Sequence, residues 1–251
     1  MRIRADLLVV ERGLAPSRHK ARQMIEQGQI LADGSTVSKA GQLLSPQQAI
    51  ELMSSGQNWV SRGGQKLAHA FTSFALPEIT GFICADIGAS TGGFCDVLLH
   101  YGAGRIYAVD VGHGQLASRI ASHPKVVNLE KLNARHLNSD HISEPLDMVV
   151  CDVSFISLTK ALPAALNYVR PGGHLVTLVK PQFEAGREHI GKKGVVKDPA
   201  IHRQVLDSIS AFLVRSGDWH IAAIAPSPIT GPEGNTEFLL HAVKSAETAN
   251  A

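Results

Sequence analysis

The chain has 251 residues, 44% of them hydrophobic and 18% charged, a length that allows one large domain and one small one. No apolar run reaches the roughly 18 residues that a membrane-spanning helix needs, and charges interrupt the N-terminal apolar residues, so we expect a cytoplasmic protein without a signal peptide or a membrane partner. The net charge is only +2, but residues 1–62 carry eight Lys and Arg against five Asp and Glu, a basic excess that favours a nucleic-acid partner.

Two helical patterns open the chain. Apolar residues at 7–9 and at Leu14 predict a first short helix. A second helix is predicted over residues 18–27, because Ser17 can cap its first turn and Gly28 can end its last.

A hairpin is predicted next, since apolar residues at 30–32 and 36–37 flank Asp33-Gly34, and residues 50–52 would complete a small sheet. These elements give a small α+β domain over residues 1–58. Within this domain one motif comprises Ser17, Arg18, Ala21, Ile25, Gly28, Ile30 and Asp33-Gly34. This motif resembles the RNA-binding domain that a small-subunit ribosomal protein shares with many pseudouridine synthases (the S-four type). The resemblance implies that basic helices meet structured RNA, with four candidate contacts: Arg4, Arg18, Lys20 and Arg22.

A glycine-rich turn follows the apolar run 82–87 and leads into a helical pattern, and a second apolar run ends at Asp110. Glycines let a backbone approach a ligand, and the N-terminus of a helix offers N–H groups that have no partner in the helix. An acid at the tip of the second strand can bind two ribose hydroxyls. The segment therefore predicts a site for an adenosine cofactor.

The spacing of the glycines indicates which cofactor. A dinucleotide site would show G-x-G-x-x-G, whereas this chain has G-x-x-x-G-G beginning at Gly88. S-adenosylmethionine (SAM) fits better, because it has a ribose and a zwitterionic tail but no phosphate. The candidate cofactor contacts are Asp86, Gly88, Ala89, Ser90, Thr91, Gly92, Gly93, Phe94, Asp110 and Asn133.

The remainder of the chain alternates between strand-like and helical segments, as a doubly wound sheet does. Seven runs predict strands: 82–88, 105–111, 125–131, 147–153, 174–180, 220–226 and 236–243. Helices are predicted near 92–101, 114–122, 155–170 and 199–216. We therefore expect a Rossmann-like α/β domain of the SAM-dependent methyltransferase type, with a seven-stranded, mostly parallel sheet, over residues 66–245. Residues 59–65 would be a linker and residues 246–251 a frayed tail.

The three cysteines show no metal-ligand spacing, and we expect no metal ion.

Four charged residues are candidates for catalysis. Asp152 and Lys180 each end a predicted strand, where ligands bind in open α/β sheets, and Glu237 stands near the start of the last strand. Lys66 lies where the two domains join. A lysine that closes a buried strand needs a partner or a chemical role.

Five segments together resemble the TlyA family, also called the hemolysin A family of rRNA ribose methyltransferases, whose catalytic domain is FtsJ-like; they are 59–67, 86–94, 107–116, 152–157 and 179–184. The resemblance implies a catalytic set of Lys66, Asp152, Lys180 and Glu237, and SAM binding by the 86–94 loop and Asp110. Its members methylate cytidine 2′-hydroxyls in 16S or 23S rRNA, so it also implies an rRNA partner. One departure is Cys95, where relatives often carry Thr.

A basic, glycine-rich segment, 186–197, follows Lys180. It is interpreted either as an RNA clamp over the site or as a solvated loop. Four further residues are candidate RNA contacts: Arg62, Arg187, Lys192 and Lys193.

Three other functions are weighed against ribose methylation. A methyltransferase acting on a base amine would want two prolines in the loop that here reads Asp152-Val153-Ser154-Phe155. A non-catalytic RNA-binding or ribosome-assembly factor would not need the four charged residues. A membrane-active hemolysin would want a long amphipathic helix, which the sequence does not predict.

Overall fold

The computed structural model describes residues 2–26, 28–33, 35–52, 59–191, 194–217 and 219–246. The chain divides into two compact units, Met1–Asn58 and Trp59–Ala251. Each described hydrophobic cluster lies inside one unit, with one cluster in the first and two in the second.

The N-terminal unit is a small α+β domain, as predicted. Its two helices are α1 (Ala5–Glu11) and α2 (Arg18–Glu26). A short ladder pairs β1 (Ile3–Arg4) with β4 (Leu43–Leu44), and a three-stranded sheet has the order β3 (Ser35–Thr36), β2 (Ile30–Ala32) and β5 (Ile50–Leu52). Leu8, Val9, Ile25 and Ile30 are nearly inaccessible to solvent and form the centre of its core.

The predicted turn chemistry of this unit is confirmed. The Ser17 hydroxyl accepts a hydrogen bond from the Lys20 N–H at 3.2 Å, which satisfies one N–H in the first turn of α2. Gly28 after α2 has φ +70° and Asp33 in the hairpin has φ +48°, conformations that glycine and aspartate tolerate best. Gln27, predicted as the last residue of the second helix, and Gly34, predicted in the hairpin turn, lie outside the described residues.

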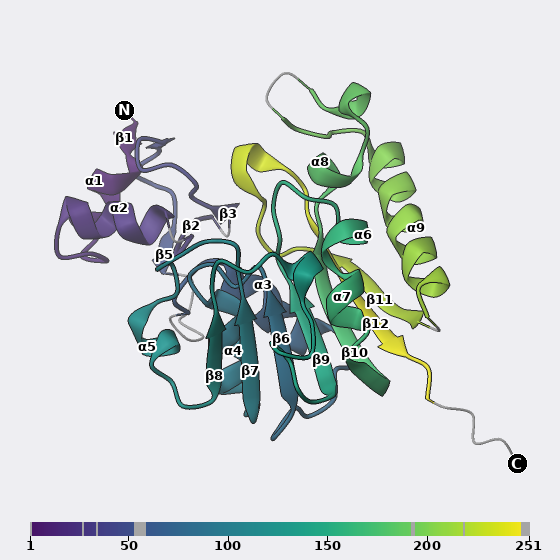
Figure 1. The fold of residues 1–251 in the computed structure, drawn as a ribbon. Helices are drawn as coiled ribbons and strands as arrows, with labels where there is room; N and C mark the ends of the chain where they lie inside the picture. Colours follow the sequence, from purple (N-terminus) through teal and green to yellow (C-terminus); the bar gives the residue numbers. More distant parts are fainter. Residues whose placement is uncertain are drawn as a thin grey trace, which may run out of the picture. The chain divides into compact units, whose positions relative to one another are not determined.

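The larger unit contains the predicted seven-stranded sheet (Figure 1), in the order β11-β12-β10-β9-β6-β7-β8. All seven predicted strands are present: β6 (Ile83–Ile87), β7 (Arg105–Val109), β8 (Val126–Leu129), β9 (Leu146–Cys151), β10 (Val169–Val179), β11 (Trp219–Pro226) and β12 (Phe238–Lys244). Only β12 runs antiparallel to its neighbours, β10 and β11. The start of β12 therefore lies at the same edge as the end of β10, and Phe238 is paired with Val179.

Helices cover both faces of this sheet. One hydrophobic cluster joins the sheet to α6 (Leu158–Ala161), α7 (Pro163–Leu166) and α9 (Pro199–Arg215). The other cluster joins it to α3 (Gly63–Ser73), α4 (Gly93–His100) and α5 (Ser118–Ala121). The remaining helix, α8 (Pro181–Glu184), directly follows β10. No helix in the described part of the chain is long and apolar enough to cross a membrane.

Two predicted helices differ from the structure, and helix α3 was not predicted. The helix expected at 155–170 is two short helices, because Pro163 has no N–H to continue α6 and instead begins α7. The helix expected at 114–122 is only the single turn α5. Helix α3 was not predicted, because its first residues, Gly63 and Gly64, are weak helix formers.

The expected linker, residues 59–65, lies inside the larger unit. The Val60 N–H donates to Asp96 Oδ2 at 2.9 Å, and Trp59 packs against the cluster that contains α3 and α4. A Cβ at Gly64 would lie 2.5 Å from the Cβ of Trp59, so this position has no room for a side chain. The segment that was expected to join the domains thus forms the start of the larger one.

The separate cores predict that a cavity in one unit leaves the other unit folded. Leu8→Ala should destabilise the N-terminal unit by about 2–5 kcal/mol, the usual cost of truncating a buried leucine. Both tryptophans, Trp59 and Trp219, lie in the larger unit. The unfolding temperature that tryptophan fluorescence reports should therefore equal that of the wild type. Circular dichroism should show that part of the helix content is lost at a lower temperature than in the wild type.

Leu7→Ala is the matched control, because Leu7 is the neighbouring residue but is exposed, and it should shift neither signal appreciably. A common shift of both signals in Leu8→Ala would show that the two units unfold together.

Candidate active site

A cavity of about 730 Å³ opens at the edge where strands β6, β7, β9 and β10 end. Its size is in the range of small-molecule sites. In open α/β sheets ligands bind at this carboxyl edge. The residues that line the cavity include all four predicted catalytic residues and eight of the predicted cofactor contacts: Gly88, Ala89, Ser90, Thr91, Gly93, Phe94, Asp110 and Asn133.

The glycine loop after β6 forms one wall of this cavity. Gly88 has φ +84° and Gly92 has φ +90°, so the loop turns twice through the left-handed region. A Cβ at Gly88 would lie 3.0 Å from Val153 Cγ1, and one at Gly92 would lie 2.8 Å from Leu116 Cδ1. A side chain at either position would push the loop away from Val153 or from Leu116, so both positions require glycine.

Asp110 holds the glycine loop from the next strand. One carboxylate oxygen accepts from the Ser90 N–H at 2.8 Å, and the other accepts from the Gly112 N–H at 2.7 Å. The carboxylate therefore joins the end of β7 to the loop after β6. It also lines the cavity, in the position where an acid can bind the hydroxyls of a ribose.

Asp86 and Gly92 were predicted as cofactor contacts, but neither is among the residues that line the cavity. Asp86 is buried below the loop, where its Oδ2 accepts from the N–H of Cys95 at 3.0 Å and from the Cys95 thiol at 3.1 Å. The carboxylate thus satisfies an N–H in the first turn of α4. Its Oδ1 is buried and has no hydrogen-bond partner within the described residues. Burial raises the pKa of Asp86 to about 7.

The four predicted catalytic residues form one chain of alternating charges. Lys66 Nζ lies 2.7 Å from Glu237 Oε2 and 3.4 Å from Asp152 Oδ2, and Lys180 Nζ lies 2.7 Å from Asp152 Oδ1. The side chains are nearly enclosed, with 10% of Lys66, 18% of Asp152, 8% of Lys180 and 1% of Glu237 exposed. Two ammonium groups thus face two carboxylates, which is how buried charges are tolerated.

The fold explains why these four residues meet. Asp152 follows β9 and Lys180 follows β10, two neighbouring parallel strands. Glu237 precedes β12, whose antiparallel direction brings its start to the same edge. Lys66 arrives from the first turns of α3, which packs against α4.

The Asp152 carboxylate is shared by both lysines. Burial opposes its ionisation, but the ammonium groups of Lys66 and Lys180 outweigh that effect, and the pKa of Asp152 is lowered. Asp152 therefore stays ionised and can fix both nitrogens. The Ser154 hydroxyl also accepts from Lys180 Nζ, at 2.9 Å. Ser154 lies in the motif that carries Asp152, but sequence reasoning assigned it no role.

Phe155 is a second residue that sequence reasoning passed over. It lines the cavity, yet 91% of it is exposed, and it has φ +65°, which is a strained conformation for an aromatic residue. Its ring lies 5.1 Å from the ring of Phe183. An exposed aromatic ring beside a site suits contact with a planar group.

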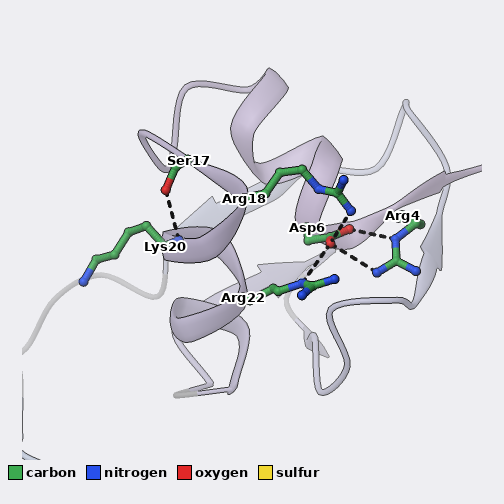
Figure 2. Close-up of polar contacts among 6 residues, drawn as sticks. All are labelled: Arg4, Asp6, Ser17, Arg18, Lys20 and Arg22. Atoms are coloured by element: carbon green, nitrogen blue, oxygen red, sulfur yellow. Dashed lines mark hydrogen bonds and ion pairs between the residues drawn. The ribbon is translucent and has the colours of Figure 1, made fainter.

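The predicted RNA contacts are found in three places. Arg62 is exposed and lines the cavity. Arg187 is exposed in the short helix Arg187–His189, and Lys192 and Lys193 lie outside the described residues. The other four candidates are in the N-terminal unit, where the side chains of Arg4, Arg18 and Arg22 surround one carboxylate and the Lys20 side chain is exposed (Figure 2).

The segment expected as an RNA clamp is held at its far end. The Asn235 side chain donates to the Gly194 carbonyl at 3.0 Å and accepts from the Val196 N–H at 3.1 Å. Asn235 stands two residues before Glu237. Its hydrogen bonds therefore hold the end of the segment that follows Lys180 close in sequence to the candidate catalytic residue Glu237.

Comparisons with known proteins agree with this architecture. The FtsJ-like methyltransferase family matches residues 59–244, and the S4 domain matches residues 3–50. The 16S/23S rRNA (cytidine-2′-O)-methyltransferase TlyA of Mycobacterium tuberculosis is 41% identical over 95% of this chain and 89% of that protein. Hemolysin A of Brachyspira hyodysenteriae is 36% identical over 95% of this chain and 99% of its own. A solved structure from Streptococcus thermophilus is 39% identical, with a TM-score of 0.74, and the match covers 97% of this chain and 89% of that one.

The buried Asp86 carboxyl predicts a pH dependence of stability. Its pKa is about 7 in the folded protein and about 4 in an unfolded chain, so between these values the folded state alone keeps the proton. Stability must then fall as the pH rises from about 4 to about 7, and the loss remains above pH 7. Asp86→Asn should remove this dependence and make the larger unit more stable than the wild type at pH 8.

Thermal unfolding followed by tryptophan fluorescence from pH 5 to pH 8 measures this effect. Asp140→Asn, at an exposed carboxyl, is the control and should keep the wild-type pH profile. The same profile in Asp86→Asn would mean that Asp86 is ionised throughout this range.

Proposed function

The chain belongs to the TlyA family of FtsJ-like methyltransferases, and we propose that it transfers a methyl group from SAM to the 2′-hydroxyl of a cytidine ribose in ribosomal RNA. The observation that carries this proposal is the chain of ion pairs from Glu237 to Lys180 beside a glycine-lined cavity. A ribose hydroxyl barely ionises at neutral pH, so the reaction needs a group that can hold the hydroxyl and take its proton.

The geometry of the cavity supports SAM as the cofactor. The tight turns at Gly88 and Gly92 leave no room for a Cβ and bring backbone close to the cavity, while Asp110 supplies an acid for the ribose. The residues that would hold the cofactor are the loop 88–94, Asp110 and Asn133. When bound, SAM supplies an activated methyl group carried on a sulfonium.

Lys180 is the residue proposed to act on the substrate. Its nitrogen binds the 2′-hydroxyl and accepts the proton as the oxygen is methylated, so the Lys180 ammonium that pairs with Asp152 must first release a proton to solvent. Asp152 and Ser154 fix the position of the nitrogen, at 2.7 Å and 2.9 Å. Lys66, which is itself paired with Glu237, in turn holds the other carboxylate oxygen of Asp152 in place. Holding two reactants in the right geometry supplies much of the rate in such reactions.

The choice of ribosomal RNA rests on the N-terminal unit and on the relatives. The S4 match covers the unit that contains Arg4, Arg18, Lys20 and Arg22, and the M. tuberculosis relative is named for cytidine 2′-O-methylation of 16S and 23S rRNA. Arg62, which lines the cavity, and Arg187, in the segment that follows Lys180, are exposed and add positive charge for the RNA backbone.

Removing the Lys180 amine should nearly abolish methyl transfer. Lys180→Ala leaves the cofactor loop unchanged, so its affinity for SAM should stay within a few-fold of the wild type. Lys66→Ala, Asp152→Ala and Glu237→Ala should each be severe, and double variants should lose little more than single ones, because the four residues act as a unit. Single-turnover assays on deproteinised 16S and 23S rRNA, with SAM carrying a labelled methyl group, measure this.

Lys160→Ala is the matched control, because Lys160 is an exposed lysine on α6 of the same unit. Near-normal turnover of Lys180→Ala would reject the proposed role of Lys180. An inactive wild-type protein that still binds rRNA would favour a non-catalytic binding factor.

Removing the Asp110 carboxylate should weaken SAM binding by about 1–3 kcal/mol, because hydrogen bonds to a charged group are lost. Isothermal titration calorimetry with SAM and its demethylated product measures the effect, and Asp140→Ala should bind as the wild type does. Tight binding of NAD without binding of SAM would overturn the cofactor assignment.

A further inference from the structure

Asp6 is a buried carboxylate surrounded by three arginines (Figure 2). Arg4 contacts both of its oxygens, with Nε 3.0 Å from Oδ1 and Nη2 3.1 Å from Oδ2. Arg18 Nη2 lies 3.0 Å from Oδ2, and Arg22 Nε lies 3.3 Å from the same atom. One acid therefore holds three guanidinium groups, of which one comes from strand β1 and two come from helix α2.

The backbone fixes the position of this carboxylate. Asp6 lies in the first turn of α1, and its N–H donates to the Ala40 carbonyl at 3.0 Å, while the Ala5 N–H donates to the Gln42 carbonyl at 2.8 Å. Arg4 extends over Gly41, where a Cβ would lie 3.3 Å from the guanidinium. Arg18 and Arg22 are four residues apart on α2, so they share one face of that helix.

The charges of this cluster do not balance. The Asp6 side chain is 0% exposed, whereas 41% of Arg4, 52% of Arg18 and 53% of Arg22 are exposed. Three positive charges against one negative charge leave an excess of two. The paired guanidinium groups hold the pKa of Asp6 well below its usual range, so the carboxylate stays charged at any working pH.

The arginines keep hydrogen-bonding capacity for a ligand. Each guanidinium has five N–H donors in a planar fork, and Asp6 accepts only one or two from each. A guanidinium can therefore bind Asp6 along one edge and a phosphate along another. An acid alone would need only one arginine to stabilise it, so stabilisation of Asp6 does not explain why three half-exposed arginines meet there.

We propose that Asp6 is a positioning residue for RNA binding, which holds Arg4, Arg18 and Arg22 as one rigid array for neighbouring backbone phosphates of folded ribosomal RNA. This inference rests on the proposed function. Arginine side chains are flexible, and fixing them before binding removes the ordering cost that RNA would otherwise impose. A negative charge on the RNA-binding unit thus strengthens its affinity for a polyanion.

Asp6→Asn in the full chain tests this directly. The change removes a negative charge, and general electrostatics alone would make the variant bind RNA more tightly. We expect the opposite, an affinity for deproteinised 16S and 23S rRNA that is at least about fivefold lower. The slope of log affinity against log salt concentration should also be less steep by about one unit, which corresponds to one lost phosphate contact. SAM affinity and tryptophan fluorescence should stay as in the wild type.

Glu11→Gln is the matched control, because Glu11 is an exposed acid at the end of the same helix. It removes the same charge without touching the arginines, and its affinity should equal or slightly exceed that of the wild type. Circular dichroism and tryptic resistance of the N-terminal unit report whether Asp6→Asn is folded.

A second pair of variants tests the array even if Asp6→Asn does not fold. Arg18→Lys and Lys20→Arg both preserve the net charge at exposed positions of α2. Lysine lacks the planar fork that can bind Asp6 and a phosphate together, so Arg18→Lys should weaken rRNA binding and Lys20→Arg should not.

A folded Asp6→Asn that binds rRNA as tightly as the wild type, or more tightly, would overturn the inference, as would equal binding by Arg18→Lys. These outcomes leave the proposed function intact as long as the wild-type chain methylates rRNA. A wild-type chain that neither binds nor methylates rRNA would instead reject the proposed function.

Discussion

The candidate site depends on one shared carboxylate, Asp152. It stands at the end of β9 and contacts the ammonium groups of both Lys66 and Lys180. Without it, two lysines would lie close together in a nearly enclosed space with only Glu237 to offset their charges, which is unfavourable in a medium of low polarity. Gly231 shows how little space remains, since a Cβ there would lie 2.3 Å from Glu237 Oε1.

The same edge of the sheet couples the charged network to the cofactor loop. Gly88 approaches the backbone carbonyl of Asp152 so closely that a Cβ would lie 3.1 Å from it. Asp110 then accepts a hydrogen bond from the loop at Ser90, and Asp86 accepts one from the first turn of α4 at Cys95. The proposed cofactor loop is thus packed against Asp152, which contacts the proposed base, Lys180, and this suits a reaction whose rate depends on position rather than on a covalent intermediate.

Much of this arrangement could be predicted from the sequence, because strand ends and glycine spacing are local features. The seven strands followed from apolar runs, and the parallel order explains why Asp152 and Lys180 meet. The role of Asp86 could not be predicted, since its burial and its contact with Cys95 depend on how α4 packs. Helix α3 was missed because Gly64, in its first turn, is required by close packing on Trp59, a contact that local propensity does not report. Asp6 was missed because its partners, Arg18 and Arg22, lie on another helix.

The central claim is that this site methylates a ribose hydroxyl and not a base. Nucleoside mass spectrometry of 16S and 23S rRNA, incubated with the wild-type protein and labelled SAM, tests it most directly. We expect the label in 2′-O-methylcytidine, and we expect no label there when Lys180→Ala replaces the wild type. Label on a nitrogen or carbon of a base, or undiminished 2′-O-methylation by Lys180→Ala, would contradict it.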